Sequence, residues 1–237
     1  MKKGLKILEN TKTLKEKIKN LLPEYAWFPV IVAFGIQLLV YAGLKLPVSH
    51  LELHDLSLPI DYKIPLVPQW IIIYYGAYFS WAISIYLIIK ESKEKCYSFA
   101  ATYIIGFLIS GVIFLCYPCT LVRPEITGTG FFMDLMRFLY WIDTPTQLFP
   151  SVHILVAYYC WRCSLDCKKI PTWYKVFNFI FMILTCFSIL FVRQHVILDI
   201  PSAIIVGELS IIIARWTKAD LVFYAHEEKK GLTYGTE

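Results

Sequence analysis

The sequence predicts an all-α integral membrane protein with six transmembrane helices. Of its 237 residues, 57% are apolar and 17% are charged, whereas a soluble domain carries about 25% charged residues. The apolar residues are gathered into blocks of about twenty, the length that a helix needs to cross a bilayer. Basic residues lie between these blocks, as membrane topology requires. The length suits one membrane domain, residues 23–216, without a second folded unit.

The N-terminal segment, residues 1–22, is predicted to be a basic amphipathic helix. Its apolar residues that share one helical face are Leu14, Ile18, Leu21 and Leu22. Such a helix lies on the anionic leaflet of a membrane, and a partly frayed charged tail is the alternative. No small-residue cleavage site follows the first apolar block, so we expect that block to remain as an anchor. Residues 217–237 are predicted to form a cytoplasmic tail.

Six apolar blocks predict the six spans. The fourth block is short and needs residues 163–165 to approach the length of about twenty residues. The segment 45–68 between the first two blocks contains four prolines. Prolines break helices, so this segment is predicted to be an ordered loop or a short interfacial piece. The predicted spans are residues 25–44, 69–89, 97–117, 149–163, 173–191 and 195–214.

The distribution of basic residues predicts the orientation in the cell membrane. With six spans both termini lie on one side, and that side receives 18 of the 23 lysines and arginines. Cytoplasmic loops carry the excess of such residues, so both termini are predicted to be cytoplasmic. Residues 118–148 and the turn 191–195 then face outward. The net charge of +5 is explained by this topology and does not indicate a nucleic-acid partner.

The outer loop 118–148 is predicted to contain a helix that lies in the membrane interface before the fourth span. The apolar residues that share its face, with a tryptophan just beyond them, are Phe131, Leu135, Phe138, Leu139 and Trp141. Asp134 and Arg137 are three residues apart on the same helix. We expect them to form a weak surface ion pair.

No metal site and no cofactor is predicted. His50 and His54 are four residues apart with Asp55 adjacent, but their proline-broken segment lacks a convincing third ligand. The seven cysteines lie mostly in or beside apolar blocks, unlike a secreted disulfide framework. Cys116 and Cys119, near the predicted outer face, can either pair with each other or serve as small apolar residues.

Three polar segments lie on the predicted outer face. They are Arg123-Pro124 after the third span, residues 150–153 at the start of the fourth, and residues 193–199 at the start of the sixth. Ionisable residues at membrane depth are costly and indicate function. A His/Asp pair at a helix start can be a simple cap, but three such segments on one predicted face favour an active site.

The residue types in these segments suit phosphoryl transfer. His195 and Asp199 are four residues apart, on the same helical face. The carboxylate can fix the imidazole tautomer and leave the other ring nitrogen free to attack phosphorus. His153 can protonate the departing alkoxide. The candidate donors to the phosphate oxygens are Arg123, Ser151 and Arg193.

These motifs resemble the signature of the type 2 phosphatidic acid phosphatase superfamily, whose members share a core with vanadium haloperoxidases. That signature is K-x6-R-P, then P-S-G-H, then S-R-x5-H-x3-D, and the resemblance covers about residues 60–215. The stretch Asp143-Thr144-Pro145 and the segment 193–199 are similar to a branch that includes bacterial lipid phosphatases. That branch also resembles inositol phosphorylceramide synthases.

The resemblance implies a role for each matching residue. His195 is the implied nucleophile, Asp199 its orienting partner and His153 the general acid. Arg123 and Ser151 are the implied phosphate-binding residues. The reaction in this family needs no metal.

The sequence departs from the family signature at three positions. Cys116 stands in place of the lysine, and Val152 in place of the glycine. Ile189 stands where the signature has arginine, although Ser188 matches. Arg193 lies four residues after Ile189, about one helical turn, so we expect it to reach the same site. These changes affect substrate choice more than the type of reaction.

The expected activity is hydrolysis of a lipid phosphate or diphosphate ester at the outer membrane face through a phosphohistidine. If an alcohol instead of water accepts the phospho group, the protein is a phosphotransferase of the inositol phosphorylceramide synthase type. A non-catalytic lipid-binding protein is a further alternative, supported by the missing lysine. A transporter is the last alternative, although the internal sequence repeats expected of a transporter are not apparent. The sequence does not identify the lipid.

Overall fold

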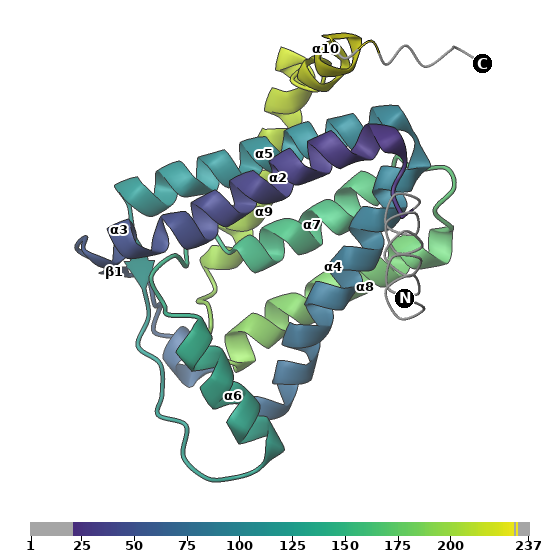
Figure 1. Cartoon of the computed structure of the whole chain (residues 1–237). Coiled ribbons are helices and arrows are strands. Elements are labelled where there is room, and N and C mark those ends of the chain that lie inside the picture. Colours follow the sequence, from purple (N-terminus) through teal and green to yellow (C-terminus); the bar gives the residue numbers. More distant parts are fainter. Residues whose placement is uncertain (1–20, 230, 232–237) are drawn as a thin grey trace, which may run out of the picture.

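The computed structural model describes residues 21–229 and 231, and most of these residues lie in helices (Figure 1). The longer helices are α2 (Trp27–Leu38), α4 (Ile71–Glu91), α5 (Lys93–Cys116), α6 (Phe131–Ile142), α7 (Val152–Ser164), α8 (Thr172–Phe191), α9 (Asp199–Thr217) and α10 (Leu221–Lys229). The shorter helical turns are η1 (Glu24–Ala26), η2 (Leu39–Gly43), α3 (Lys45–Ser49), η3 (Asp61–Lys63) and η4 (Pro68–Trp70). The all-helical prediction is confirmed for this part of the chain.

Helix α7 lies at the centre of the bundle. It contacts α4, α5, α8 and α9, while α2 packs against α5 (Figure 1). All residues from Val152 to Cys160 are buried, because neighbouring helices cover this helix on every side. A helix that is apolar all round belongs in a protein core. The residues at its first turn are therefore held in place by the whole bundle.

Two glycines allow the neighbouring helices to approach α7 closely. A Cβ atom at Gly207 of α9 would lie 2.7 Å from the ring of Tyr158, and one at Gly106 of α5 would overlap the hydroxyl of Tyr159. Any larger side chain at either position would push its helix away from α7. These contacts help to fix the position of α9, whose first residue is Asp199.

Five helical segments are long and apolar enough to cross a membrane, which indicates a membrane protein. They are Glu24–Ser49, Pro68–Glu91, Lys93–Cys116, Thr172–Phe191 and Asp199–Thr217. Each overlaps one of the six predicted spans. The fourth predicted span is α7, which has 13 residues and a length of about 20 Å, against about 30 Å for the hydrocarbon core. Six membrane-length helices are therefore not found among the described residues.

Helix α6 lies where the sequence predicts a helix in the outer loop. The predicted apolar face is divided, since Leu139 is buried against the bundle whereas Phe131 and Phe138 are exposed. The expected pair between Arg137 and Asp134 is present, with Nη1 and Oδ1 2.7 Å apart on an exposed surface. The division of the face follows from docking, because one side of α6 packs on the bundle and the other stays open.

The loop 45–68 is ordered by a short parallel pairing of strand β1 (His54–Asp55) with strand β2 (Cys119–Thr120). His54 is in register with Cys119. This pairing ties the loop to the segment that leads to Arg123. Cys119 is buried and Cys116 is exposed, and neither forms a disulfide.

The two ends of the chain differ in what the structure describes. The helix predicted for residues 1–22 lies almost wholly outside the described residues. The predicted tail 217–237 contains α10, whose Phe223 ring lies 5.4 Å from the Tyr97 ring. Glu227 of α10 also accepts a hydrogen bond of 2.9 Å from Lys93. The first part of the tail is therefore docked against the start of α5.

Candidate active site

The three polar segments meet at one end of the bundle. His153 is the second residue of α7, Asp199 is the first residue of α9, and His195 lies in the turn between α8 and α9. Arg123 lies on the segment that follows β2 and contacts the turn through Gln194. The packing of α7 against α9 thus brings together residues that are far apart in the sequence.

The imidazole of His195 is held by Asp199. His195 Nδ1 lies 2.9 Å from Asp199 Oδ2, which also accepts a hydrogen bond of 3.1 Å from the backbone N–H of Val196. The side chains of His195 and Asp199 are both buried. Because the carboxylate can only accept, Nδ1 carries the proton and Nε2 keeps its lone pair. This is the tautomer that a nucleophilic histidine needs.

His153 lies against the free nitrogen of His195. Its Nδ1 is 3.2 Å from His195 Nε2, and its Nε2 is 2.7 Å from the Tyr74 hydroxyl oxygen and 3.1 Å from that of Tyr78. Since His195 Nε2 carries a lone pair, we assign the proton between the rings to His153 Nδ1. Nε2 then has one lone pair, which accepts a hydrogen bond from a tyrosine hydroxyl, and the Tyr74 hydroxyl is the closer one. His153 therefore directs its proton toward His195 Nε2.

Arg123 supplies the positive charge of the site. Its guanidinium donates to the carbonyl of Asp143 and to Gln194 Oε1, and lies 4.7 Å from the centre of the Tyr140 ring. Burial lowers the pKa of Arg123 from its ordinary value, and the charge of Asp143 opposes that shift. Among the described residues, Arg123 Nε and Gln194 Nε2 are buried without an acceptor. Two unused buried donors are costly and favour an anionic ligand here.

Ser151 is placed at the start of α7, beside the histidines. Its fully buried side chain accepts a hydrogen bond of 3.4 Å from the backbone N–H of Ile154, and so caps the helix. Its own backbone N–H donates to the carbonyl of Asp199 at 3.3 Å. Ser151 therefore links the starts of α7 and α9. Its direct binding of phosphate stays a prediction.

The guanidinium of Arg193 is bound by backbone carbonyls. It donates to the carbonyl oxygens of Asp61 at 2.6 Å and Ile64 at 2.7 Å. Arg193 has a φ of +54°, the left-handed conformation that turns the chain after α8. These contacts favour a structural role in holding the turn on the 61–64 loop. None of these contacts tests whether Arg193 binds phosphate, so that predicted role stays a prediction.

The positions that depart from the family signature supply no cation to the site. Ile189 is fully buried, and its carbonyl accepts hydrogen bonds from the backbone N–H groups of Gln194 and His195 at 2.9 and 3.2 Å. Cys116 is the exposed last residue of α5. Among the described residues, the guanidinium that contacts this site through Asp143 and Gln194 is therefore that of Arg123.

A small cavity lies beside the two histidines. It has a volume of about 10 Å³ and is lined in part by Tyr41, Asp143 and Gln147. Such a cavity has room for about one water molecule. A phosphate group is larger, so one placed between the histidines would have to separate His153 from His195.

Sequence reasoning missed several polar residues of the site. Gln194 lies inside the segment 193–199, so the sequence alone could have indicated its amide as a phosphate contact. Tyr74 and Tyr78 are one helical turn apart at the predicted outer end of the second span, a spacing that indicates a shared polar contact. Tyr41, whose hydroxyl donates to Asp143 Oδ1 at 2.6 Å, carries no comparable signal.

Comparison with known proteins adds no family to this description. The chain matched no protein-family model, no curated protein and no solved structure. The functional proposal therefore depends on the geometry of the site and on the resemblance of its motifs.

Proposed function

We propose that the protein is a membrane lipid phosphatase that hydrolyses a phosphate or diphosphate ester through a phosphohistidine. The observation that supports this most directly is the continuous chain of contacts from Asp199 through His195 to His153. It sets an oriented nucleophilic nitrogen beside a proton donor. The resemblance of the motifs to the type 2 phosphatidic acid phosphatase signature supports the same reaction.

In the first step the phosphoryl group lies between the two imidazoles. The negative charge of the phosphate stabilises the protonated imidazolium form of His153. His195 Nε2 attacks phosphorus, an N–P bond forms as the P–O ester bond breaks, and His153 gives its Nδ1 proton to the leaving oxygen. Asp199 stabilises the positive charge that His195 acquires. Arg123 and Gln194, through their unused donors, stabilise the phosphate oxygens.

In the second step water releases the phosphate. His153, now neutral, accepts a proton from the water as its oxygen attacks phosphorus. The N–P bond breaks, inorganic phosphate leaves, and both histidines return to their starting states. Tyr74 and Tyr78 accommodate each change at His153 Nε2, because a hydroxyl can donate or accept.

The proposal includes six crossings of the membrane, with both termini cytoplasmic and the site on the outer face. Helix α7 supports the sixth crossing although it is short. Its first turn contacts Tyr74 near the start of α4. Beyond its end, the backbone N–H groups of Lys168 and Lys169 donate to Glu91 at the end of α4. With the residues that follow it, α7 therefore extends beside α4 from Tyr74 to Glu91. The exposed side of α6 would lie in the outer interface.

Purified full-length protein, offered a panel of lipid phosphates and diphosphates in the presence of a chelator, tests this function. We expect release of inorganic phosphate that is abolished in His195→Ala and His153→Ala. His50→Ala removes an exposed histidine and serves as the matched control. Acid-labile radioactive phosphate on His195 in the quenched reaction would identify the intermediate. Full activity in His195→Ala would exclude the mechanism, and silence on the whole panel would favour a non-catalytic lipid-binding protein.

A lipid phosphotransferase is the second candidate, and one observation favours it. The Asp143 carboxylate, held by Tyr41 at 2.6 Å, lines the cavity beside the histidines. A carboxylate near a single guanidinium suits a phosphodiester with one negative charge, and it can accept a hydrogen bond from the hydroxyl of an incoming alcohol. Transfer of a labelled phospho group to an added alcohol such as inositol would support this reading. Asp143→Asn should then reduce transfer more than hydrolysis.

A further inference from the structure

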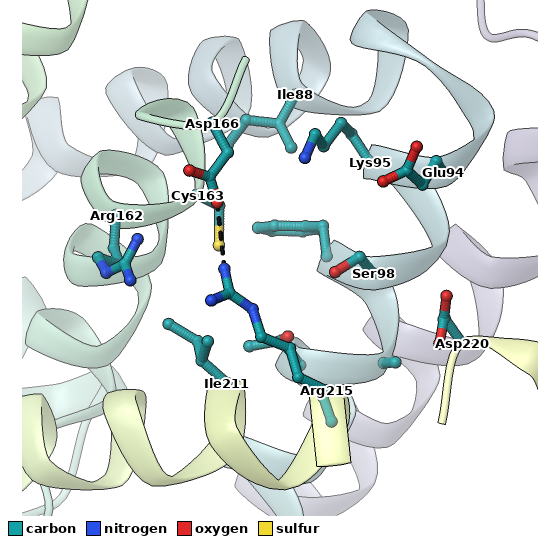
Figure 2. Close-up of a pocket in the computed structure, with 14 residues that line it drawn as sticks. Ile88, Glu94, Lys95, Ser98, Arg162, Cys163, Asp166, Ile211, Arg215 and Asp220 are labelled. Atoms are coloured by element: carbon teal, nitrogen blue, oxygen red, sulfur yellow. Dashed lines mark hydrogen bonds and ion pairs between the residues drawn. The ribbon is translucent and has the colours of Figure 1, made fainter. Parts of the chain in front are cut away.

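Figure 2 shows a second cavity, of about 370 Å³. It lies at the end of the bundle opposite the histidines. Its basic residues mark the position: Lys95 is near the start of α5, whereas Arg162 and Arg215 are near the ends of α7 and α9. His153 and Asp199 occupy the other ends of α7 and α9. Cavities of about 300–1,000 Å³ are typical of small-ligand sites. The cavity beside the histidines is far smaller.

The lengths of the helices explain why this space exists. Helix α7 has 13 residues, whereas α5 and α9, which flank it, have 24 and 19. The central helix ends first, and its last residues line the cavity instead of filling it. Arg162, Cys163 and Asp166 contribute to the wall from this end. The space is therefore built by the fold and does not depend on one side chain.

Basic side chains from three helices line the cavity. Figure 2 shows the Lys95 ammonium and the Arg215 guanidinium directed into it. Lys95 Nζ has no hydrogen-bond partner within 21–229. Arg162 uses Nε for its contact with Glu208 at 3.0 Å, which leaves its terminal nitrogens available.

The ion pair of Arg215 is easily exchanged. Arg215 Nη2 lies 3.1 Å from Asp166 Oδ2, and the two side chains are 58% and 47% exposed. Exposed pairs of this kind contribute little to stability, because both charges are well solvated. An anion that enters the cavity can therefore take the place of Asp166.

Two hydroxyl groups complete a set of donors on α5. Ser98 and Thr102 follow Lys95 at intervals of three and four residues, so the three side chains lie on one face of the helix. Thr102 is only 4% exposed. Neither hydroxyl has a hydrogen-bond partner in the described part of the chain. The two hydroxyls therefore line the same cavity as Lys95 and Arg215.

Acidic residues limit the charge of the ligand. Glu94, Asp166 and Asp220 also line the cavity, and they balance the charge of its three basic residues. Because these carboxylates leave the cavity without excess positive charge, we expect a ligand with one negative charge to be favoured over one with two or more. A phosphodiester carries one negative charge and matches the donors as well as a phosphate monoester does.

We propose that this cavity binds a phosphodiester group, held by Lys95 and Arg215 with hydrogen bonds from Ser98 and Thr102. The group can come from a phospholipid head group or from a soluble diester, and the same donors recognise both. The proposal does not depend on the function proposed for the histidine site, because it concerns a separate cavity and is tested by binding.

Binding to the full-length protein in a neutral detergent tests the proposal. The probes are dihexanoyl-phosphatidylglycerol, the soluble diester glycerophosphoglycerol, uncharged dihexanoylglycerol and inorganic phosphate. We expect the first probe to bind and dihexanoylglycerol not to bind. Binding of both diesters would show that the head group suffices, and binding of the lipid alone would identify a membrane source. Inorganic phosphate binding as tightly as the diesters would overturn the assignment of a singly charged ligand.

Variants locate the bound probe. Lys95→Gln and Arg215→Gln should each raise the Kd for dihexanoyl-phosphatidylglycerol at least tenfold, whereas Lys95→Arg should retain binding and so separate loss of charge from loss of fold. Lys168→Gln is the matched control, an exposed lysine at the same end of the bundle. His195→Ala should bind with unchanged Kd. A Kd that is unchanged in Lys95→Gln, or raised only in His195→Ala, would place the probe elsewhere and refute the proposal.

Discussion

The carboxylate of Asp61 accepts a hydrogen bond of 2.9 Å from the backbone N–H of Ile197, two residues beyond His195. The other carboxylate oxygen accepts one of 2.8 Å from the backbone N–H of Leu58. Asp61 is only 2% exposed, and its own carbonyl binds Arg193. One residue of the loop 45–68 therefore holds both sides of the turn that carries His195.

Asp61→Asn should weaken the active site without touching the substrate. An asparagine can accept from one of the two N–H groups, but its NH2 then faces the other donor. We expect the free energy of unfolding to fall by about 2 kcal/mol and kcat to fall roughly 10- to 100-fold as His195 shifts. Thermal unfolding and steady-state kinetics measure both effects.

Asp55→Asn is the control for this variant. Asp55 caps the backbone N–H of Ser57 at 2.8 Å in the same loop but is exposed. This variant should keep kcat within about twofold of the wild-type value, since substitutions of exposed residues have small effects. Equal losses in Asp55→Asn and Asp61→Asn would show that the loop as a whole, and not the Asp61 contact, supports the site.

Asp199→Asn should abolish most activity while the protein stays folded. The amide cannot hold His195 Nδ1–H in the same way, so the imidazole takes the wrong tautomer and loses its stabilised cationic form. In a comparable catalytic arrangement this change costs about 10⁴-fold in kcat. Glu208→Gln, on the same helix but paired with Arg162, provides the comparison. Activity of Asp199→Asn near the wild-type level would remove His195 from the role of nucleophile.

Tyr74 and its neighbour Tyr75 offer a matched pair. The Tyr74 hydroxyl contacts His153 Nε2 at 2.7 Å, whereas the buried Tyr75 hydroxyl has no partner in the described residues. Tyr74→Phe should lower kcat about tenfold, the equivalent of roughly 1.4 kcal/mol for a lost hydrogen bond. Tyr75→Phe should leave kcat unchanged and leave stability equal or slightly higher. The pH–rate profile should change only in Tyr74→Phe, because, of these two hydroxyls, only that of Tyr74 contacts His153.

Thiol labelling distinguishes the two cysteines near β2. Burial, with the charges of Asp199 and Asp55, raises the pKa of Cys119 to about 12. The thiolate is the reactive form, so its population near pH 7.5 is negligible and rises only as the pH approaches 12. N-ethylmaleimide should therefore modify exposed Cys116 in the Cys119→Ser variant and leave Cys119 unmodified in Cys116→Ser. In the wild-type protein without reductant, a disulfide between Cys116 and Cys119 would instead lower the intact mass by about 2 Da.

The helices and the His195–Asp199 contact could be predicted because both depend on local spacing. Blocks of apolar residues define α4, α5, α8 and α9 within a few residues. Asp199 lies four residues after His195, which places the two side chains together across one turn. The contact of His153 with His195 does not follow from local spacing. It could be predicted only with the distribution of lysines and arginines, which predicts both histidines on the outer face.

The contacts that could not be predicted depend on packing between distant segments. Arg193 lies one turn from Ile189 only if the chain stays helical, but its φ of +54° ends the helix and directs the guanidinium to the 61–64 loop. The partners of Asp61 and Tyr74 lie 136 and 79 residues away. Helical and strand repeats relate residues only a few positions apart along the chain. Partners at these separations therefore appear only in the folded structure.

The short central helix has a consequence for how the chain enters a membrane. With 13 residues, α7 is below the length of about 17 residues at which a helix becomes stable across the lipid by itself. We therefore expect α7 to insert only together with α8, as a helical hairpin, once α4 and α5 offer a surface to receive it. Truncation after Ser164 should leave α7 outside the bilayer, accessible to added protease. His153 would then reach its position beside His195 only after most of the protein has been synthesised.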